Sequence, residues 1–197
     1  MDYDDSYVDY QNNRSRVRKA VRSLYLRAAA GQLVGPTLDI GCGLGDLLRL
    51  LPHGSAGLEY NKAAVERCNE NGLPVSYYDG FKDDWRLGMF SERARFGSMV
   101  ISHVLEHLDA PAEILRKLLV SAARLEIRRV LVIVPGKAGF NSDETHRTFV
   151  DLELLSHPEI TRGLPFTLRN SRYFPFNFRR LGDWFTHHEL QALYEVH

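Results

Sequence analysis

The sequence is poor in cysteine, has no long apolar run and carries no excess of charge of either sign. Two cysteines are too few for a disulfide framework, and the acidic first residues do not resemble a secretory signal, so we expect a reduced, cytoplasmic protein. No apolar run approaches the roughly 18 residues that span a bilayer, so we expect no membrane insertion. Lys plus Arg and Asp plus Glu both number 25, so the chain has no net positive charge. An anionic partner would therefore have to bind to a local basic patch.

The length and composition favour a single folded domain. A length of 197 residues allows one domain and argues against two independent cores, and a hydrophobic content of 44% suffices to form a core. Residues 1–13 contain no aliphatic run, so we expect a mobile tail or a lid there. Apolar residues recur at helical spacing over residues 14–31, which predicts an amphipathic helix. A central core at residues 36–136 and a C-terminal part at residues 137–197 complete the domain.

Short apolar runs alternate with helical patterns through the central core. Strands are predicted within residues 37–45, 55–60, 74–79, 96–102 and 130–134. Helices are predicted at residues 46–51, 61–71 and 109–125. This alternation predicts a doubly wound α/β fold, with a mostly parallel sheet and helices on both of its faces.

The alternation stops after Gly136. A polar loop over residues 137–148 leads to a short helix around 151–157, and two strands are predicted at 166–176 and 183–196. Two strands with little helix between them are joined most simply as an antiparallel hairpin, which we expect at one edge of the sheet.

Glycines 41, 43 and 45 lie where the first strand turns into a helix. Their missing side chains would let a ligand approach the backbone at the start of the helix, although glycine also serves plain tight turns. Glu59 ends the second strand 18 residues after Gly41, where doubly wound folds place the carboxylate that accepts both ribose hydroxyls of a nucleotide. Together these residues predict a nucleoside site.

The glycine spacing indicates which nucleotide is bound. Dinucleotide folds use G-x-G-x-x-G over a pyrophosphate, whereas this sequence has G-x-G-x-G followed by Asp46. Because an anion at the start of the helix opposes a pyrophosphate, we do not expect a dinucleotide here.

Four segments in this order resemble the class I S-adenosylmethionine-dependent methyltransferases. They are the glycine-rich segment 38–46, LDIGCGLGD; the acidic segment 58–60, LEY; the turn 78–80, YDG; and the segment 103–108, HVLEHL. The resemblance spans residues 36–136 and implies a Rossmann-like methyltransferase fold, in which a terminal hairpin is also expected.

The resemblance further implies that the cofactor is S-adenosyl-L-methionine. It assigns to the cofactor site Asp39, Gly41, Cys42, Gly43 and Gly45 around the methionine part, Glu59 at the ribose, Tyr60 at the adenine face, Asp79 and Gly80 at the adenine edge, and His103. For Tyr60 and Asp79, packing and turn formation are the alternative interpretations.

Three histidines are candidates for acceptor chemistry. His103 and His107, with Glu106 between them, follow the fourth strand, and His146 lies in the loop after the fifth, so all should meet at the ligand-binding edge of the sheet. Histidine suits a general base for a hydroxyl acceptor, and we predict this role, or substrate contact, for His107, His146 and His103.

Metal binding and plain packing are the alternatives for the same group. The small-RNA 3′-terminal 2′-O-methyltransferases look similar, with a Glu-x-x-Glu-His segment and a later histidine that bind a metal. This sequence has His103 where they have glutamate, so we assign no metal ligand. We expect His187, His188 and His197, in or beyond the last strand, at the surface.

Two stretches, residues 10–38 and 160–182, contain arginines and no acids. Both stretches are either solvated surfaces or contacts for an anionic acceptor. The second stretch is the better candidate for an acceptor, because aromatic residues are interleaved with its arginines. The loop 143–151 loosely resembles acceptor-site loops of methyltransferases that act on polysaccharides and small metabolites. We therefore predict a methyltransferase for a hydroxyl of a small-molecule or glycan acceptor. The alternatives are a nucleic-acid methyltransferase, with or without a metal, and a module that binds the cofactor without catalysis.

Overall fold

The computed structural model describes the backbone of residues 16–91 and 95–197, and side chains from residue 23 onward. The predicted tail at residues 1–13 lies outside the described residues. The predicted N-terminal helix is present as α2 (Arg16–Ala30). None of the described helices is long and apolar enough to cross a membrane.

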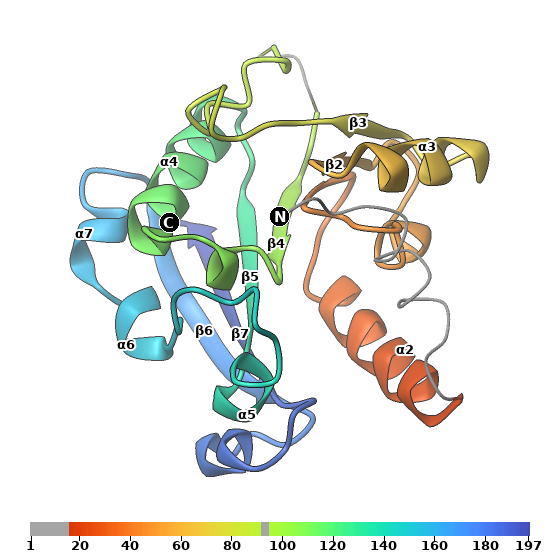
Figure 1. Ribbon diagram of the computed structural model, residues 1–197. Coiled ribbons are helices and arrows are strands. Elements are labelled where there is room, and N and C mark those ends of the chain that lie inside the picture. Colours follow the sequence, from red (N-terminus) through yellow and green to blue (C-terminus); the bar gives the residue numbers. More distant parts are fainter. Residues whose placement is uncertain (1–15, 92–94) are drawn as a thin grey trace.

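Seven strands of the described chain form one sheet in the order β3-β2-β1-β4-β5-β7-β6 (Figure 1). They are β1 (Thr37–Ile40), β2 (Ala56–Glu59), β3 (Val75–Tyr77), β4 (Ser98–Ser102), β5 (Arg129–Pro135), β6 (Phe166–Phe174) and β7 (Glu189–Val196). The first five are parallel, and β7 pairs antiparallel with both β5 and β6. The predicted parallel sheet with a terminal antiparallel hairpin is therefore confirmed.

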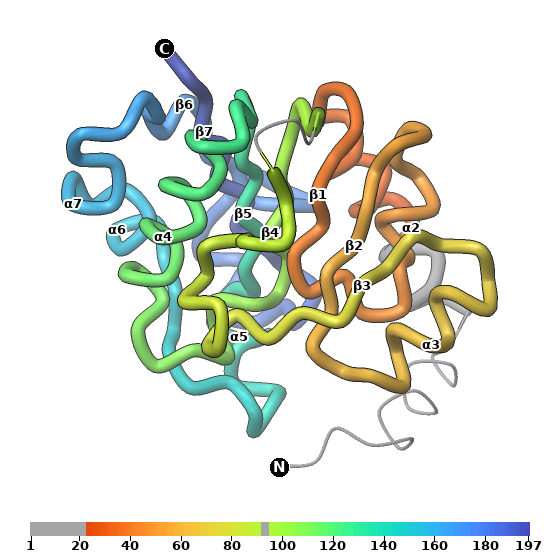
Figure 2. Tube along the Cα trace, turned by 90° about the horizontal axis from the view of Figure 1, so that it is seen from above, coloured from red at the N-terminus to blue at the C-terminus, as the bar shows by residue number. Residues whose placement is uncertain are grey.

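Helices cover both faces of this sheet, as Figure 2 shows from above. Besides α2 they are α3 (Lys62–Glu70), α4 (Pro111–Arg124), α5 (Lys137–Phe140), α6 (Leu152–Leu155) and α7 (Pro158–Thr161), with 3-10 turns η1 (Leu48–Leu50), η2 (Leu105–His107) and η3 (Arg179–Asp183). Asn61 caps α3 by accepting a hydrogen bond from the backbone N–H of Ala64, and Gly72 follows its end in a left-handed conformation, as the sequence predicts.

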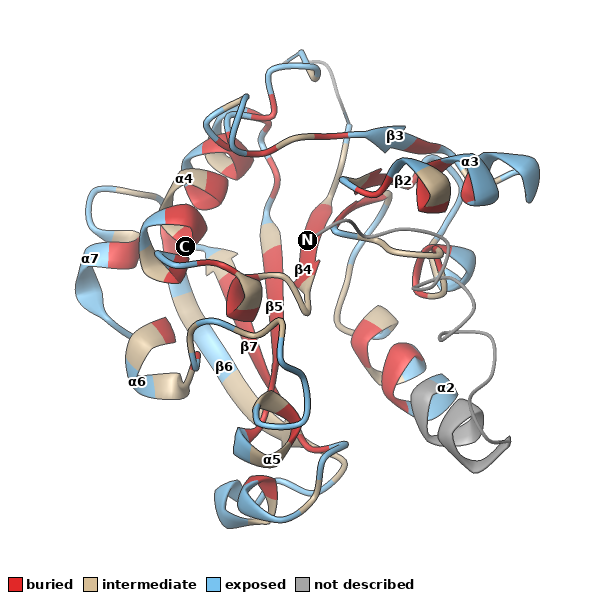
Figure 3. Cartoon of the chain, in the orientation of Figure 1, coloured by how far each residue is buried: buried red, intermediate tan, exposed pale blue. Residues whose placement is uncertain are grey.

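The central strand β5 contributes side chains to two hydrophobic clusters, one on each face of the sheet. Its side chains alternate between faces, so that Val130, Val132 and Val134 pack with α4, whereas Leu131 and Ile133 pack with α2. All five are fully buried, and Figure 3 shows the buried residues concentrated along β4 and β5. A continuous apolar run, β-branched at every position of 130–134 except Leu131, therefore marks a strand that is covered on both faces.

Two predicted elements are shorter than expected. The helix predicted at 46–51 is reduced to the turn η1, because the residue before Pro52 is pushed out of the helical region and Leu51 is extended. The strand predicted from residue 183 begins at Glu189, whose partner in β5 is Pro135, the last residue of that strand. Without a partner strand beyond it, residues 179–183 form η3 instead.

Candidate active site

The segments of interest follow the carboxyl ends of neighbouring parallel strands. The glycine loop follows β1, Tyr60 follows β2, Asp79 lies two residues past the end of β3, and His103 follows β4 directly. Since β1 is flanked by β2 on one side and β4 on the other, the chain reverses its direction across the sheet at this point. Open α/β sheets bind ligands at such a reversal.

In the glycine loop, two of the three glycines lie against neighbouring side chains, and the third does not. Gly41, Gly43 and Gly45 all have positive φ, of 68°, 55° and 73°. A Cβ at Gly41 would lie 2.4 Å from Val104, and one at Gly45 would lie 2.5 Å from Leu73. At Gly43 a Cβ would meet no described atom within 4 Å. Packing of the fold therefore requires two of the glycines, whereas the space beside Gly43 is open.

Glu59 fastens this loop to the end of β2. Its Oε2 accepts a hydrogen bond from the backbone N–H of Gly43, and its Oε1 accepts one from that of Asn61, both at 2.8 Å. The backbone N–H groups of Gly41 and Cys42 donate to the carbonyl of Leu58 in the same strand. The carboxylate that the sequence assigns to a ribose is thus also part of the loop's framework.

Two acidic groups, one in β1 and one within the loop itself, are kept protonated. Asp39 is 2% exposed, and burial, reinforced by the charge of Glu59, raises the pKa of its carboxyl group to about 8. Burial, with Asp39 and Glu59 adding to it, also raises the pKa of the Cys42 thiol far above its usual range. Cys42 therefore contributes a neutral side chain here and is no nucleophile.

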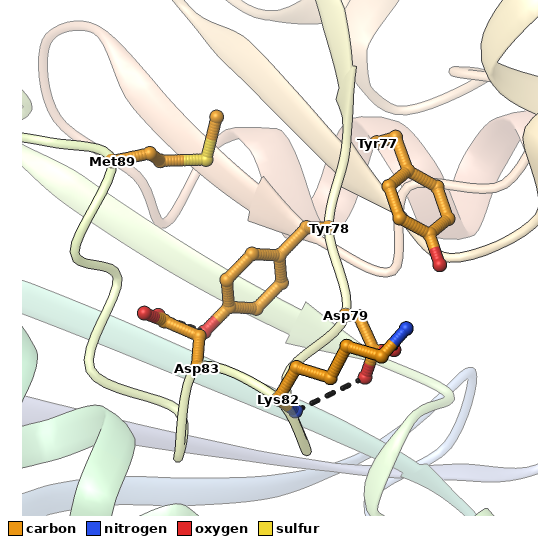
Figure 4. Close-up of a pocket in the computed structure, with 6 residues that line it drawn as sticks. All are labelled: Tyr77, Tyr78, Asp79, Lys82, Asp83 and Met89. Atoms are coloured by element: carbon orange, nitrogen blue, oxygen red, sulfur yellow. Dashed lines mark hydrogen bonds and ion pairs between the residues drawn. The ribbon is translucent and has the colours of Figure 1, made fainter.

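Aromatic rings and a pocket adjoin the ends of β2 and β3. The rings of Tyr60 and Tyr77 lie 5.9 Å apart between centroids, and Tyr60 is 59% exposed. A pocket of about 330 Å³ is lined by Tyr77, Tyr78, Asp79, Lys82, Asp83 and Met89 (Figure 4). Asp79 accepts the backbone N–H of Lys82 and forms an ion pair with its ammonium at 3.1 Å, so it also forms a turn. Gly80 is required because a Cβ there would lie 2.6 Å from the ring of Trp85.

His103 lies between two carboxylates. Its Nδ1 is 3.0 Å from Oε1 of Glu106, and its Nε2 is 3.2 Å from Oε1 of Glu189 in β7. Burial lowers the pKa of His103, but the hydrogen bonds with Glu106 and Glu189 outweigh burial and raise it to about 10. Both ring nitrogens are therefore engaged, and the charged imidazolium links the loop after β4 to the terminal hairpin.

The other two predicted histidines, His107 and His146, lie close together beside Glu106. The rings of His107 and His146 lie 4.8 Å apart between centroids. The backbone N–H groups of Arg147 and Thr148 donate to the carbonyl of Glu106, at 2.8 and 3.1 Å, and hold the loop of His146 against η2. Burial lowers the pKa of His107, so this imidazole is neutral near pH 7.

The sequence places the chain in a known family. The model of the family described as methionine biosynthesis protein MetW matches residues 29–138, which is more than half of the chain. The chain belongs to the MetW family. No curated protein matches the sequence of this MetW chain.

Solved structures share the fold of this MetW chain. A SAM-dependent methyltransferase from Archaeoglobus fulgidus has a TM-score of 0.68 at 18% identity, covering 98% of this chain and 100% of that one. The methyltransferase domain of bacterial CtHen1-C has a TM-score of 0.61 at 16% identity, covering 88% and 95%. Magnesium protoporphyrin IX methyltransferase from Synechocystis PCC 6803 has a TM-score of 0.61 at 13% identity, covering 94% and 89%. The predicted Rossmann-like methyltransferase fold is therefore confirmed.

His188 of the MetW chain lies in a different environment from the one predicted from the sequence. His188 is fully buried, its Nε2 is 3.1 Å from the carbonyl of Phe176, and its ring stacks on Tyr173 at 5.2 Å. The ring fills space beside Gly182, where a Cβ would lie 2.8 Å from its Nδ1. The surface expectation for His188 is wrong, whereas His187 and His197 are exposed as predicted.

Some arginines of the C-terminal basic stretch, residues 160–182, are engaged in contacts within the protein. Arg172 donates to the side chain of Gln191 and to the carbonyl of Ala28, and Arg162 forms an ion pair with Glu159. Large aromatic side chains of this stretch and the turn after it are exposed, namely Phe176, Phe178 and Trp184. Four arginines of the stretch are exposed as well, namely Arg162, Arg169, Arg179 and Arg180, so its solvent-facing part is both basic and aromatic.

Proposed function

We propose that this chain uses S-adenosylmethionine to methylate a hydroxyl oxygen of a small-molecule or glycan acceptor. The observation that carries the proposal is the open space at Gly43, beside the carboxylate of Glu59 that binds its backbone N–H. Membership of the MetW family and the methyltransferase fold support the same function.

The residues around the glycine loop fit this cofactor. Each oxygen of Glu59 accepts one backbone hydrogen bond and keeps a lone pair that can accept a ribose hydroxyl. The exposed ring of Tyr60 offers a face for adenine, and Asp79 borders the pocket that begins at Tyr77. When bound, S-adenosylmethionine would supply a methyl group on a sulfonium, so the protein would chiefly align the acceptor.

We assign the acceptor side to His107 and His146. A neutral imidazole can take the proton of an acceptor hydroxyl, and burial keeps His107 neutral. His146 is held beside it by the backbone bonds to Glu106. For His103, whose ring nitrogens both lie against carboxylates, we propose a positioning role toward Glu106.

The description of the MetW family names methionine biosynthesis, which supports a small metabolite as the acceptor.

One observation favours a nucleic acid as the acceptor instead. Phe176, Phe178 and Trp184 are exposed by 66, 61 and 87%, and Arg179 and Arg180 lie among them in the sequence. Exposed rings beside arginines are typical of surfaces that stack single-stranded bases.

Two experiments, calorimetry followed by a methyl-transfer assay, test the proposal. We expect S-adenosylhomocysteine to bind at micromolar concentration and NAD not to bind, whereas tight binding of NAD would contradict the assignment of the loop. The protein is then incubated with methyl-labelled S-adenosylmethionine and either a panel of metabolites and oligosaccharides or RNA. Label in the first panel supports the proposal, and label in RNA alone overturns the acceptor class. Binding without transfer to any acceptor would indicate a module without catalysis.

A further inference from the structure

We propose that Glu106, His107 and His146 form a binding site for a first-row divalent metal ion such as Zn²⁺. Each of the three residues offers one potential ligand atom, and these atoms lie within 4.8 Å of one another. Two imidazole nitrogens and one carboxylate oxygen are a ligand set that such ions accept. Zinc ligands bind at roughly 2.0–2.2 Å, which places the ligand atoms of a tetrahedral ion about 3.4 Å apart. The longest separations between the three atoms therefore need to shorten by about 1.4 Å when an ion binds.

The hydrogen bonds of His107 leave its Nε2 available as a ligand. Its Nδ1 lies 3.1 Å from the hydroxyl oxygen of Thr145 and 3.4 Å from the carbonyl oxygen of the same residue. The hydroxyl of Thr145 donates its proton to Oδ1 of Asp143 at 2.6 Å, so toward His107 it acts as an acceptor. The proton of the neutral ring therefore resides on Nδ1, and the lone pair resides on Nε2.

His146 has the same arrangement on a different partner. Its Nδ1 is 2.8 Å from the carbonyl oxygen of Phe140, and a carbonyl can only accept, so Nδ1 carries the proton. Its Nε2 lies 3.9 Å from Oδ2 of Asp143, which is too long for a hydrogen bond. Metal-binding histidines are held in this way, with the second ring nitrogen donating to a backbone or side-chain oxygen.

Glu106 supplies an independent indication. Its side chain is fully buried, its Oε1 is held by Nδ1 of His103 at 3.0 Å, and its Oε2 has no hydrogen-bond partner among the described residues. A buried carboxylate oxygen without a partner is costly, and a metal ion would satisfy it. The backbone bonds from Arg147 and Thr148 to the carbonyl of Glu106 fix the three ligands relative to one another before an ion binds.

Three protein ligands would leave a coordination position for another group. If the proposed function is correct, an acceptor hydroxyl bound there would lose its proton more readily, and this would replace proton transfer to a histidine. That consequence rests on the proposed function, whereas the metal site itself does not.

The test is metal binding by the full chain, treated with a chelator and freed of any purification tag. Zn²⁺ is titrated calorimetrically, and Co²⁺ is followed by its visible absorption. We expect one ion per chain for the unaltered protein and a loss of affinity of more than about 10-fold for His146→Ala and for His107→Ala. The exposed His187→Ala is the matched control and should bind as the unaltered protein does.

Thermal unfolding and S-adenosylhomocysteine binding are measured on the same samples. Folded protein that binds the nucleoside but neither ion would overturn the metal site and leave the proposed function intact. Metal binding that survives both His146→Ala and His107→Ala would also overturn the site. Metal binding without nucleoside binding would support the site and contradict the proposed function.

Discussion

The carboxylate of Glu59 and the backbone N–H of Gly43 form a 2.8 Å hydrogen bond between the end of β2 and the loop after β1. The bond holds the one glycine of the loop that faces open space. A single carboxylate thereby sets the shape of the loop and offers acceptor capacity to a ligand. Its removal should affect binding through both roles.

We expect Glu59→Gln to weaken S-adenosylhomocysteine binding by at least about 10-fold. An amide keeps one acceptor oxygen and replaces the other by a donor, so one backbone N–H loses its partner and the charge is lost. Hydrogen bonds to a charged group contribute roughly 1.5 to 3 kcal/mol. Titration calorimetry measures the change, with Glu66→Gln on the exposed side of α3 as the control. Unchanged affinity in Glu59→Gln would place the ribose elsewhere.

A second prediction separates backbone strain from ligand contact at Gly43. Gly43 and Gly72 have φ of 55° and 72°, and at either position an added Cβ meets no described atom within 4 Å. Alanine should therefore strain both backbones by a similar amount, about 1 to 2 kcal/mol. Only Gly43→Ala should lower the affinity for S-adenosylhomocysteine, because Gly72 lies beyond the end of α3. Urea unfolding and calorimetry give the two quantities, and equal affinities in both variants would contradict a ligand at Gly43.

The fold could be predicted from the sequence because its signals are local. The apolar run in β5, the cap at Asn61 and the glycine spacing each act over a few residues. The antiparallel hairpin at the edge of the sheet could be predicted from the lack of helix between the last two strands. The helix predicted at 46–51 was overestimated because Pro52 acts on the residue before it.

The histidine cluster could be predicted only in part, because long-range contacts determine it. The backbone bonds from Arg147 and Thr148 to Glu106 bring His146 to His107, and no pattern in the loop announces them. The pairing of His103 with Glu189 joins residues 86 positions apart. With Glu106 on Nδ1 and Glu189 on Nε2, both ring nitrogens of His103 are engaged, which the sequence does not predict.

The carboxyl group of Asp39 makes stability depend on pH in an unusual direction. Its pKa is raised to about 8 in the folded chain by burial and by the charge of Glu59, whereas in the unfolded chain it returns to its ordinary value of 3.8. Between these values the unfolded chain loses a proton that the folded chain keeps. The free energy of unfolding therefore falls as pH rises from about 4 to about 8, with a slope of up to about 1.4 kcal/mol per pH unit from this group.

Replacing Asp39 by asparagine should remove that slope, because the amide is neutral at every pH and close in shape to the protonated acid. The free energy of unfolding of Asp39→Asn minus that of the unaltered protein should increase with pH between pH 5 and pH 8. Urea unfolding at each pH measures this difference. Above about pH 8 both states of the unaltered protein are ionised at this position, so the difference should become constant, which serves as an internal control. A difference that stays flat from pH 5 to pH 8 would mean that Asp39 is already ionised in the folded protein.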